Sequence, residues 1–245
     1  MKADFHHSTL ASLAYQDQSP EIDAQFKELG YEDIRFINID GAQVYLVSNK
    51  NHVAIAFRGT EVTQMSDVVA DLKAWKKRSK VAGKVHDGFY DEVEKVWKSL
   101  IFELTTLGVG KSLSICGHSL GAAMATIMAS RCALNYDFPE VECLFTYGSP
   151  RVGWPTYVKS LLICHYRWQN NNDIVTRVPL RLMNYKHDGT LMYIGHDGTV
   201  HEKKMGVWAK FSDRMKGMWG GLKSFKVDNF SDHAMTEYIK HIENW

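Results

Sequence analysis

The chain has 245 residues, 45% of them hydrophobic and 23% charged, and its formal net charge is +1. This is the composition of an ordinary globular protein, and the balanced charge argues against a nucleic-acid partner. The length predicts a single α/β domain over residues 1–245. No apolar run reaches the roughly 18 residues that a membrane-spanning helix requires, so no transmembrane segment is predicted.

The N-terminus and the cysteines bear on the cellular compartment. Residues 1–7 are polar and lack the basic start and apolar run of a secretory signal. No Cys-x-x-Cys spacing occurs, so no zinc site is predicted. The cysteines are expected to be buried free thiols: Cys116, Cys132, Cys143 and Cys164. These features favour a cytoplasmic, reducing compartment over secretion.

The first 57 residues predict a helical segment followed by strands. Apolar residues recur at helical spacing over 8–29, and Gly30 ends that segment. Three strands are then expected, over residues 35–39, 43–47 and 52–57. The first two are joined by Asp40-Gly41, which is a hairpin signal. An antiparallel edge leading into an α/β sheet is therefore predicted.

The strand over 52–57 ends in Arg58-Gly59-Thr60, which is a candidate oxyanion-hole segment because Thr60 can offer both its N–H and its hydroxyl. The alternative is a turn in which Thr60 caps a helix. A short helix is predicted over 65–75, followed by a basic run over 76–80. We interpret residues 61–84 as a candidate lid; the alternative is a solvated helix with a charged turn.

A nucleophile elbow is predicted in the middle of the chain. After a long helix over 90–107, a short apolar strand over 113–116 runs into Gly117-His118-Ser119-Leu120-Gly121, and a helix over 122–134 follows. The Gly-x-Ser-x-Gly pattern between a strand and a helix places the serine hydroxyl above a sheet. The Leu120 N–H, at the start of the helix, points at any oxyanion formed there.

Beyond the elbow, strands and helices alternate. Strands are expected over 141–147 and 161–168, and a hairpin over 191–202. The alternation predicts an α/β fold with a mostly parallel central sheet and helices on both faces. Residues 208–222 form a basic amphipathic stretch, which either packs on the core or contacts a lipid surface.

A nucleophilic serine needs a base and an orienting acid, and elbow-type hydrolases order them as serine, acid, histidine. Asp173 follows a buried strand, where parallel sheets hold their sites. His233 begins a C-terminal segment that can reach the elbow. From order and placement we choose the set Ser119, Asp173 and His233, at about even odds against all the alternatives together. The remaining candidates for base and acid are His165, His187, His196, His201, His241, Asp188 and Asp197.

The chain resembles the class 3 lipases, which are fungal and bacterial α/β-hydrolases, and is closer to the bacterial branch. The matching segments run in family order over nearly the whole chain: Leu13-Ala14-Tyr15, Ala56-Phe57-Arg58-Gly59-Thr60, Ala70-Asp71-Leu72, Val85-His86-Asp87-Gly88-Phe89, the elbow, Gly148-Ser149-Pro150-Arg151-Val152-Gly153, Asn172-Asp173-Ile174-Val175, Val178-Pro179 and Asp232-His233.

The resemblance implies an α/β-hydrolase fold and a lipase that hydrolyses esters of acyl glycerols without a metal or cofactor. It implies Ser119 as nucleophile, Asp173 as acid and His233 as base, with Thr60 and Leu120 as the oxyanion hole. Its partners would be a lipid or ester substrate and a lipid–water interface. The alternatives are a phospholipase A1 or short-chain esterase, and a lipid-surface binding protein without turnover. Secreted members carry signal peptides and disulfides, which this chain does not clearly show.

Overall fold

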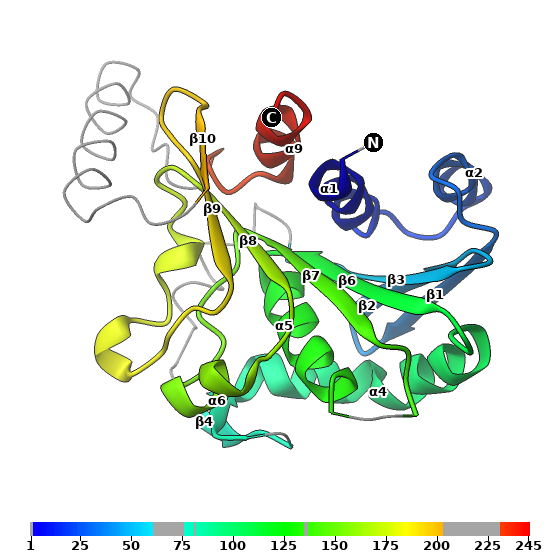
Figure 1. Ribbon diagram of the computed structural model, residues 1–245, viewed down its shortest axis with the longest axis horizontal. Helices are drawn as coiled ribbons and strands as arrows, with labels where there is room; N and C mark the ends of the chain where they lie inside the picture. The colour runs from blue at the N-terminus through cyan, green and yellow to red at the C-terminus, as the bar shows by residue number, and fades with distance from the viewer. Residues whose placement is uncertain (1, 61–75, 81, 135–136, 203–230) are drawn as a thin grey trace.

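The structure is a computed structural model that describes residues 2–60, 76–80, 82–134, 137–202 and 231–245 (Figure 1). Its helices are α1 Ala3–Leu13, α2 Pro20–Glu28, α4 Asp87–Leu107, α5 Leu120–Cys132, α6 Pro155–Ser160 and α9 Met235–Glu243, with short 3-10 turns at Val175–Arg177 and Arg181–Met183. Its strands are β1 Asp33–Ile39, β2 Ala42–Ser48, β3 His52–Phe57, β4 Lys76–Arg78, β5 Lys84–His86, β6 Ser112–His118, β7 Val141–Tyr147, β8 His165–Asn170, β9 Thr190–Ile194 and β10 Val200–Glu202.

Eight strands form one sheet in the order β1-β2-β3-β6-β7-β8-β9-β10. The central strands, from β3 through β6, β7 and β8 to β9, are parallel. The β1-β2-β3 edge and the β9-β10 edge are antiparallel. The predicted mostly parallel central sheet with an antiparallel N-terminal edge is therefore confirmed. β4 and β5 pair separately.

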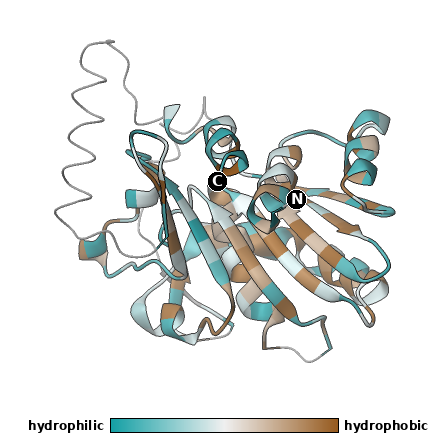
Figure 2. Ribbon diagram, turned by 45° about the horizontal axis from the view of Figure 1, so that its top comes forward, coloured by the Kyte–Doolittle hydropathy of each residue, from teal (hydrophilic) through white to brown (hydrophobic). Residues whose placement is uncertain are grey.

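Helices cover both faces of the sheet, as predicted. α4, α5 and α6 lie on one face, and α1, α2 and α9 lie on the other (Figure 1). Strands in the middle of the sheet such as β3 and β7 carry mainly hydrophobic residues, which is expected for strands buried on both faces (Figure 2). Two hydrophobic clusters result, one on each side of the sheet.

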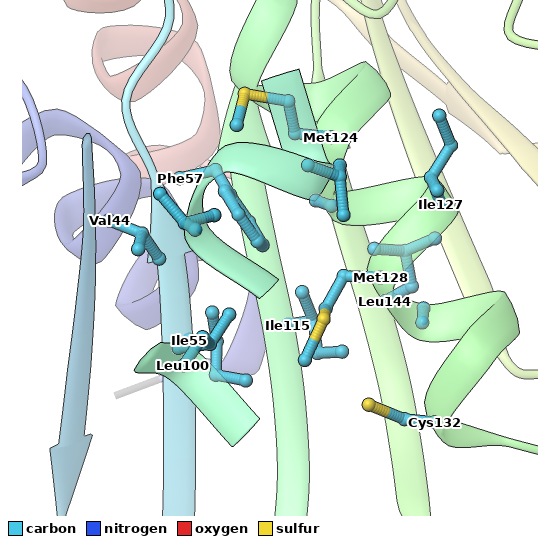
Figure 3. Close-up of a cluster of buried hydrophobic side chains, with 14 of the residues drawn as sticks. Val44, Ile55, Phe57, Leu100, Ile115, Met124, Ile127, Met128, Cys132 and Leu144 are labelled. Carbon is cyan, nitrogen blue, oxygen red and sulfur yellow. The ribbon is translucent and has the colours of Figure 1, made fainter. Parts of the chain in front are cut away.

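The cluster on the α4–α5 face fixes the helix that follows the elbow. Phe57 and Ile115 on the strands face Met124 and Met128 of α5, and Leu100 of α4 closes the group (Figure 3). Every residue of α5 from Gly121 to Cys132 is buried. A helix buried on all sides cannot shift without losing packing along its whole length, so its first turn is held in place.

Several predicted boundaries are wrong. Residues 8–29 form two helices rather than one, because Ser19 caps Ile22 N–H and Pro20 starts a new helix at its first position. The long helix begins at Asp87 rather than Tyr90. β8 begins at His165 rather than Leu161, since residues 155–160 form α6 and Leu162 is 91% exposed.

Other predictions lie outside the described residues. These are the helix over 65–75 and the basic amphipathic stretch over 208–222. The basic run over 76–80 is described, and β4 begins at its first residue, Lys76. The lid over 61–84 and the single domain over 1–245 stay predictions. Within the part of the chain that the structure describes, no helix is both long and apolar enough to cross a bilayer.

Candidate active site

The elbow at Ser119 has the geometry that the motif predicts. Ser119 lies between the end of β6 and the start of α5, with φ 58° and ψ −126°. A residue with a side chain rarely adopts this backbone conformation, and such strain is typical of functional sites. The Ser119 N–H donates to the Tyr147 carbonyl at 3.0 Å, which ties the elbow to the end of β7.

The two elbow glycines are required by close backbone approach. A Cβ atom on Gly117 would lie 2.4 Å from the Gly121 carbonyl oxygen, and one on Gly121 would lie 2.4 Å from the Phe57 carbonyl oxygen. No side chain fits at such distances. The first turn of α5 is therefore pressed against both β6 and the end of β3.

Thr60 lies beside this elbow. A Cβ on the preceding residue, Gly59, would lie 3.1 Å from the Ser119 Cβ, so the segment that leaves β3 closely approaches the serine. Thr60 is partly buried, and Leu120 is the first residue of α5. Both predicted oxyanion donors thus flank Ser119, and their role stays a prediction.

Asp173 and His233 are brought together from loops 60 residues apart. His233 Nδ1 and Asp173 Oδ2 are 2.9 Å apart, and both side chains are fully buried. A carboxylate only accepts hydrogen bonds, so Nδ1 carries a proton, and in the neutral form of the ring Nε2 carries the lone pair. His233 Nε2 is buried and has no hydrogen-bond partner among the described residues. This is the atom that a general base uses.

The carboxylate of Asp173 is held by two further donors. Val175 N–H donates to Oδ1 at 2.9 Å, and the Tyr238 hydroxyl donates to Oδ2 at 2.6 Å. Burial, together with the Asp173 charge, raises the pKa of Tyr238 well above its ordinary value, so Tyr238 remains a donor. Sequence reasoning missed Tyr238, which is otherwise an ordinary apolar-face residue of α9.

The loop that carries Asp173 is attached to the loop that carries His233 through Asp232. The Asn172 N–H and the Asn171 side-chain amide both donate to Asp232 Oδ2, at 3.0 and 3.2 Å. The Asn170 side-chain amide donates to the Asp232 carbonyl at 3.0 Å. These bonds keep acid and base at a fixed separation.

His118, the second residue of the elbow motif, packs against His233. Its ring lies 4.5 Å from the His233 ring between centroids, and its Nε2 donates to the His233 carbonyl at 2.7 Å. Nδ1 must then accept, and the Tyr15 hydroxyl donates to it at 2.6 Å. Burial, followed by the nearby His233, lowers the pKa of His118 well below its usual value, so this ring stays neutral.

Gly148 is a further site residue that sequence reasoning did not single out by itself. It follows β7 with φ 59°, and a Cβ there would lie 2.8 Å from His233 Nδ1 and 2.9 Å from Asp173 Oδ2. Ser119 is bonded to Tyr147, the residue before it. Gly148 therefore lies between the elbow and the histidine–carboxylate pair. The sequence feature that could have identified Gly148 is its position directly after a buried strand.

The other candidate bases and acids lie elsewhere. His165 is on the α5–α6 face of β8, bonded to Thr146 Oγ1 at 2.8 Å and to Asp188 Oδ2 at 3.0 Å. His187 Nε2 donates to the Thr176 carbonyl at 2.8 Å. The remainder belong to the β9–β10 hairpin or to the surface of α9: His196, Asp197, His201 and His241.

The contact between Tyr15 and His118 leads to a stability prediction. Tyr15→Phe removes the donor to a buried ring nitrogen, and an unsatisfied buried acceptor costs about 1–3 kcal/mol. We expect the free energy of unfolding in urea to fall by that amount. Tyr166→Phe is the control, because the Tyr166 hydroxyl makes no hydrogen bond to other described residues. Equal stability of the two variants would show that the Tyr15 hydroxyl contributes nothing.

The chain is similar in sequence to known proteins. The chain is 40% identical over 101 residues to Toxin TseL of Vibrio cholerae, covering 41% of this chain and 15% of the toxin. It is 30% identical over 176 residues to secreted mono- and diacylglycerol lipase A of Penicillium cyclopium, covering 69% of this chain and 56% of that enzyme. The chain thus spans less than two thirds of the length of either relative.

A solved structure shows the same fold. The triacylglyceride lipase of Rhizomucor miehei aligns with a TM-score of 0.64 at 21% identity, over 77% of this chain and 78% of that chain. This likeness shows the α/β-hydrolase fold. The family described as lipase (class 3) matches residues 54–183, which is just over half of the chain and includes Ser119 and Asp173. By this match, the chain belongs to the class 3 lipase family.

Proposed function

We propose that this protein is a lipase that hydrolyses carboxylic esters of acyl glycerols through an acyl-enzyme intermediate. The observation that carries the proposal is the buried hydrogen bond between His233 Nδ1 and Asp173 Oδ2 beside the strained elbow at Ser119. A hydrogen-bonded histidine–carboxylate pair next to a serine on an elbow is the arrangement that activates a serine hydroxyl. Two relatives whose names specify acyl glycerols support the substrate class.

In the proposed mechanism, His233 Nε2 takes the proton from the Ser119 hydroxyl as the oxygen attacks the ester carbonyl. The Thr60 and Leu120 N–H groups, with the Thr60 hydroxyl, hold the oxyanion. The alcohol leaves with the proton from His233, and the acyl group stays on Ser119. A water molecule then gives its proton to His233 and attacks the acyl-enzyme; His233 returns the proton to the Ser119 oxygen as the fatty acid is released. Asp173 holds the His233 tautomer and stabilises the imidazolium.

The lid assignment for residues 61–84 is part of this proposal. Ser119 and His233 are fully buried, so an ester can reach them only after part of the chain moves. The segment that follows Thr60 is the candidate in the sequence, since it follows directly on Gly59, where an added Cβ would lie 3.1 Å from the Ser119 Cβ. Its opening at a lipid–water interface would couple the rate to substrate aggregation.

A series of p-nitrophenyl esters from acetate to palmitate tests the proposed substrate class. We expect preference for long acyl chains and a rise in rate once the substrate exceeds its solubility limit, because the buried site must open. Preference for short chains with simple saturation would instead identify a short-chain esterase. A parallel assay on phosphatidylcholine and triolein emulsions separates phospholipase A1 from acyl-glycerol activity.

Labelling with a fluorophosphonate separates a hydrolase from a non-catalytic lipid-binding protein. Only a serine activated by a base reacts rapidly with this probe. We expect a single labelled site at Ser119 in the intact protein. A chain that binds lipid vesicles but takes up no label would contradict the proposed chemistry.

A further inference from the structure

Two cysteines meet across neighbouring strands at the end of the sheet opposite the elbow. Cys143 is the third residue of β7 and is buried; Cys164 immediately precedes β8 and is exposed. Their Sγ atoms are 2.7 Å apart. The expectation that all four cysteines are buried is thus wrong for Cys164, which lies at the surface because β8 begins only at His165.

The backbone holds these two residues side by side. Leu144 pairs with His165 in the parallel register, and the Leu144 N–H donates to the Cys164 carbonyl at 2.8 Å. Neighbouring strands lie about 4.8 Å apart. That spacing falls within the roughly 4.4–6.8 Å between Cα atoms that a disulfide spans. The two sulfur atoms therefore need only a small side-chain adjustment to bond.

We propose that Cys143 and Cys164 are a disulfide-forming pair, which a small-molecule disulfide such as oxidised glutathione converts to a cystine that links β7 to β8. This modification site is independent of the proposed ester hydrolysis. The Cys164 thiolate attacks one sulfur of oxidised glutathione and displaces a glutathione thiolate, which leaves a mixed disulfide. The Cys143 thiol then loses its proton, its sulfur attacks the Cys164 sulfur, and the second glutathione leaves. Two protein thiols are oxidised and one oxidised glutathione is reduced to two glutathione molecules.

Exposure sets the order of the two steps. Cys164 is open to solvent, whereas burial and the contact with Cys164 raise the pKa of the Cys143 thiol. Cys164 is therefore the entry point, and Cys143 is the resolving thiol.

The other two cysteines should not react with oxidised glutathione. Cys116 on β6 and Cys132 on α5 belong to clusters on opposite faces of the sheet, and burial raises the pKa of both thiols, that of Cys132 to about 12. Two of the four thiols should react and two should not.

The disulfide would close a loop that contains a residue of the candidate site. The chain between Cys143 and Cys164 contains Gly148, which lies against His233 and Asp173, and also α6. A closed loop of this size restricts the unfolded chain, which stabilises the folded one. Since the bond lies at the amino end of β8, away from the elbow, we expect greater stability with unchanged ester turnover.

The test is equilibration of the folded protein in glutathione buffers of increasing oxidised fraction, followed by unfolding, alkylation and non-reducing peptide mapping. We expect two free thiols per chain, a cross-linked pair of peptides that contain Cys143 and Cys164, and a melting temperature higher by roughly 5–10 °C than that of the reduced protein. Dithiothreitol should reverse both changes.

Cys164→Ser is the main variant, since an exposed serine should not disturb folding. Its melting temperature should be the same in oxidised and reduced buffer, whereas Cys132→Ala should retain the shift. Four free thiols at equilibrium in oxidised glutathione, or glutathione that remains on Cys164 without closure to Cys143, would overturn the proposal. Because the readouts are thiol counts and melting temperature, failure here leaves the ester assays unaffected.

Discussion

Ser119→Ala is expected to lower kcat for ester hydrolysis by at least about a thousandfold. The Ser119 hydroxyl is the proposed nucleophile, and no other group at the elbow can form the acyl-enzyme. Alanine keeps the size of the residue and the same strained backbone, so the variant should fold. Initial rates on p-nitrophenyl esters, with circular dichroism to verify folding, give the result directly.

Ser160→Ala is the matched control for this experiment. Ser160 ends α6, and among the described residues its hydroxyl donates to the Tyr157 carbonyl at 2.7 Å. Its rate and its fluorophosphonate labelling should match those of the unmodified protein. If Ser119→Ala retained most of the activity, Ser119 could not be the nucleophile, regardless of the fluorophosphonate labelling result.

Gly148→Ala is expected to lower kcat by at least about a hundredfold, since a misplacement of reacting groups by about 1 Å is enough for such a loss. The added Cβ would lie 2.8 Å from His233 Nδ1 and 2.9 Å from Asp173 Oδ2. Both atoms belong to the hydrogen bond that orients the base. The methyl group must push the pair apart or displace the loop after β7.

Gly110→Ala separates this clash from backbone strain. Gly110 has φ 70°, close to the 59° of Gly148, but a Cβ there meets no atom within 4 Å. Gly110→Ala should lose about 1–2 kcal/mol of unfolding free energy from the left-handed conformation, and Gly148→Ala should lose more because of the added clash. Only Gly148→Ala should lose activity. Wild-type kcat in Gly148→Ala would mean that the His233–Asp173 bond does not orient the base for catalysis.

The strands and the elbow could be predicted because their signals are local. β7 has the predicted bounds, Val141–Tyr147, and the Gly-x-Ser-x-Gly motif lies between a strand and a helix as expected. Alternation of strands and helices is enough to predict parallel pairing. The prediction of a continuous helical segment was wrong at Ser19-Pro20. The helical spacing of apolar residues continues across this point, although Ser19 caps a new helix there.

The supporting residues of the candidate site could not be predicted, because their roles depend on contacts between distant parts of the chain. Tyr238 and Asp173 are 65 residues apart, and Tyr15 and His118 are 103 apart. Tyr238 occurs in no pattern that distinguishes it from a core residue, and the matching segment Leu13-Ala14-Tyr15 does not indicate the contact of Tyr15 with His118. Motif order indicated Asp173 and His233, but their hydrogen bond follows from the topology that places β8 near the loop before α9.

The terminal helices affect the chemistry more than their positions in the chain suggest. α1 and α9 pack on each other across one face of the sheet. Tyr15, just after α1, holds the imidazole beneath the base, and Tyr238 on α9 holds the carboxylate beside it. A fluctuation that lifts either helix would remove one of these supports while the sheet stays paired. We therefore expect ester turnover to be lost through such a sub-global opening at a lower temperature than the one at which the sheet unfolds.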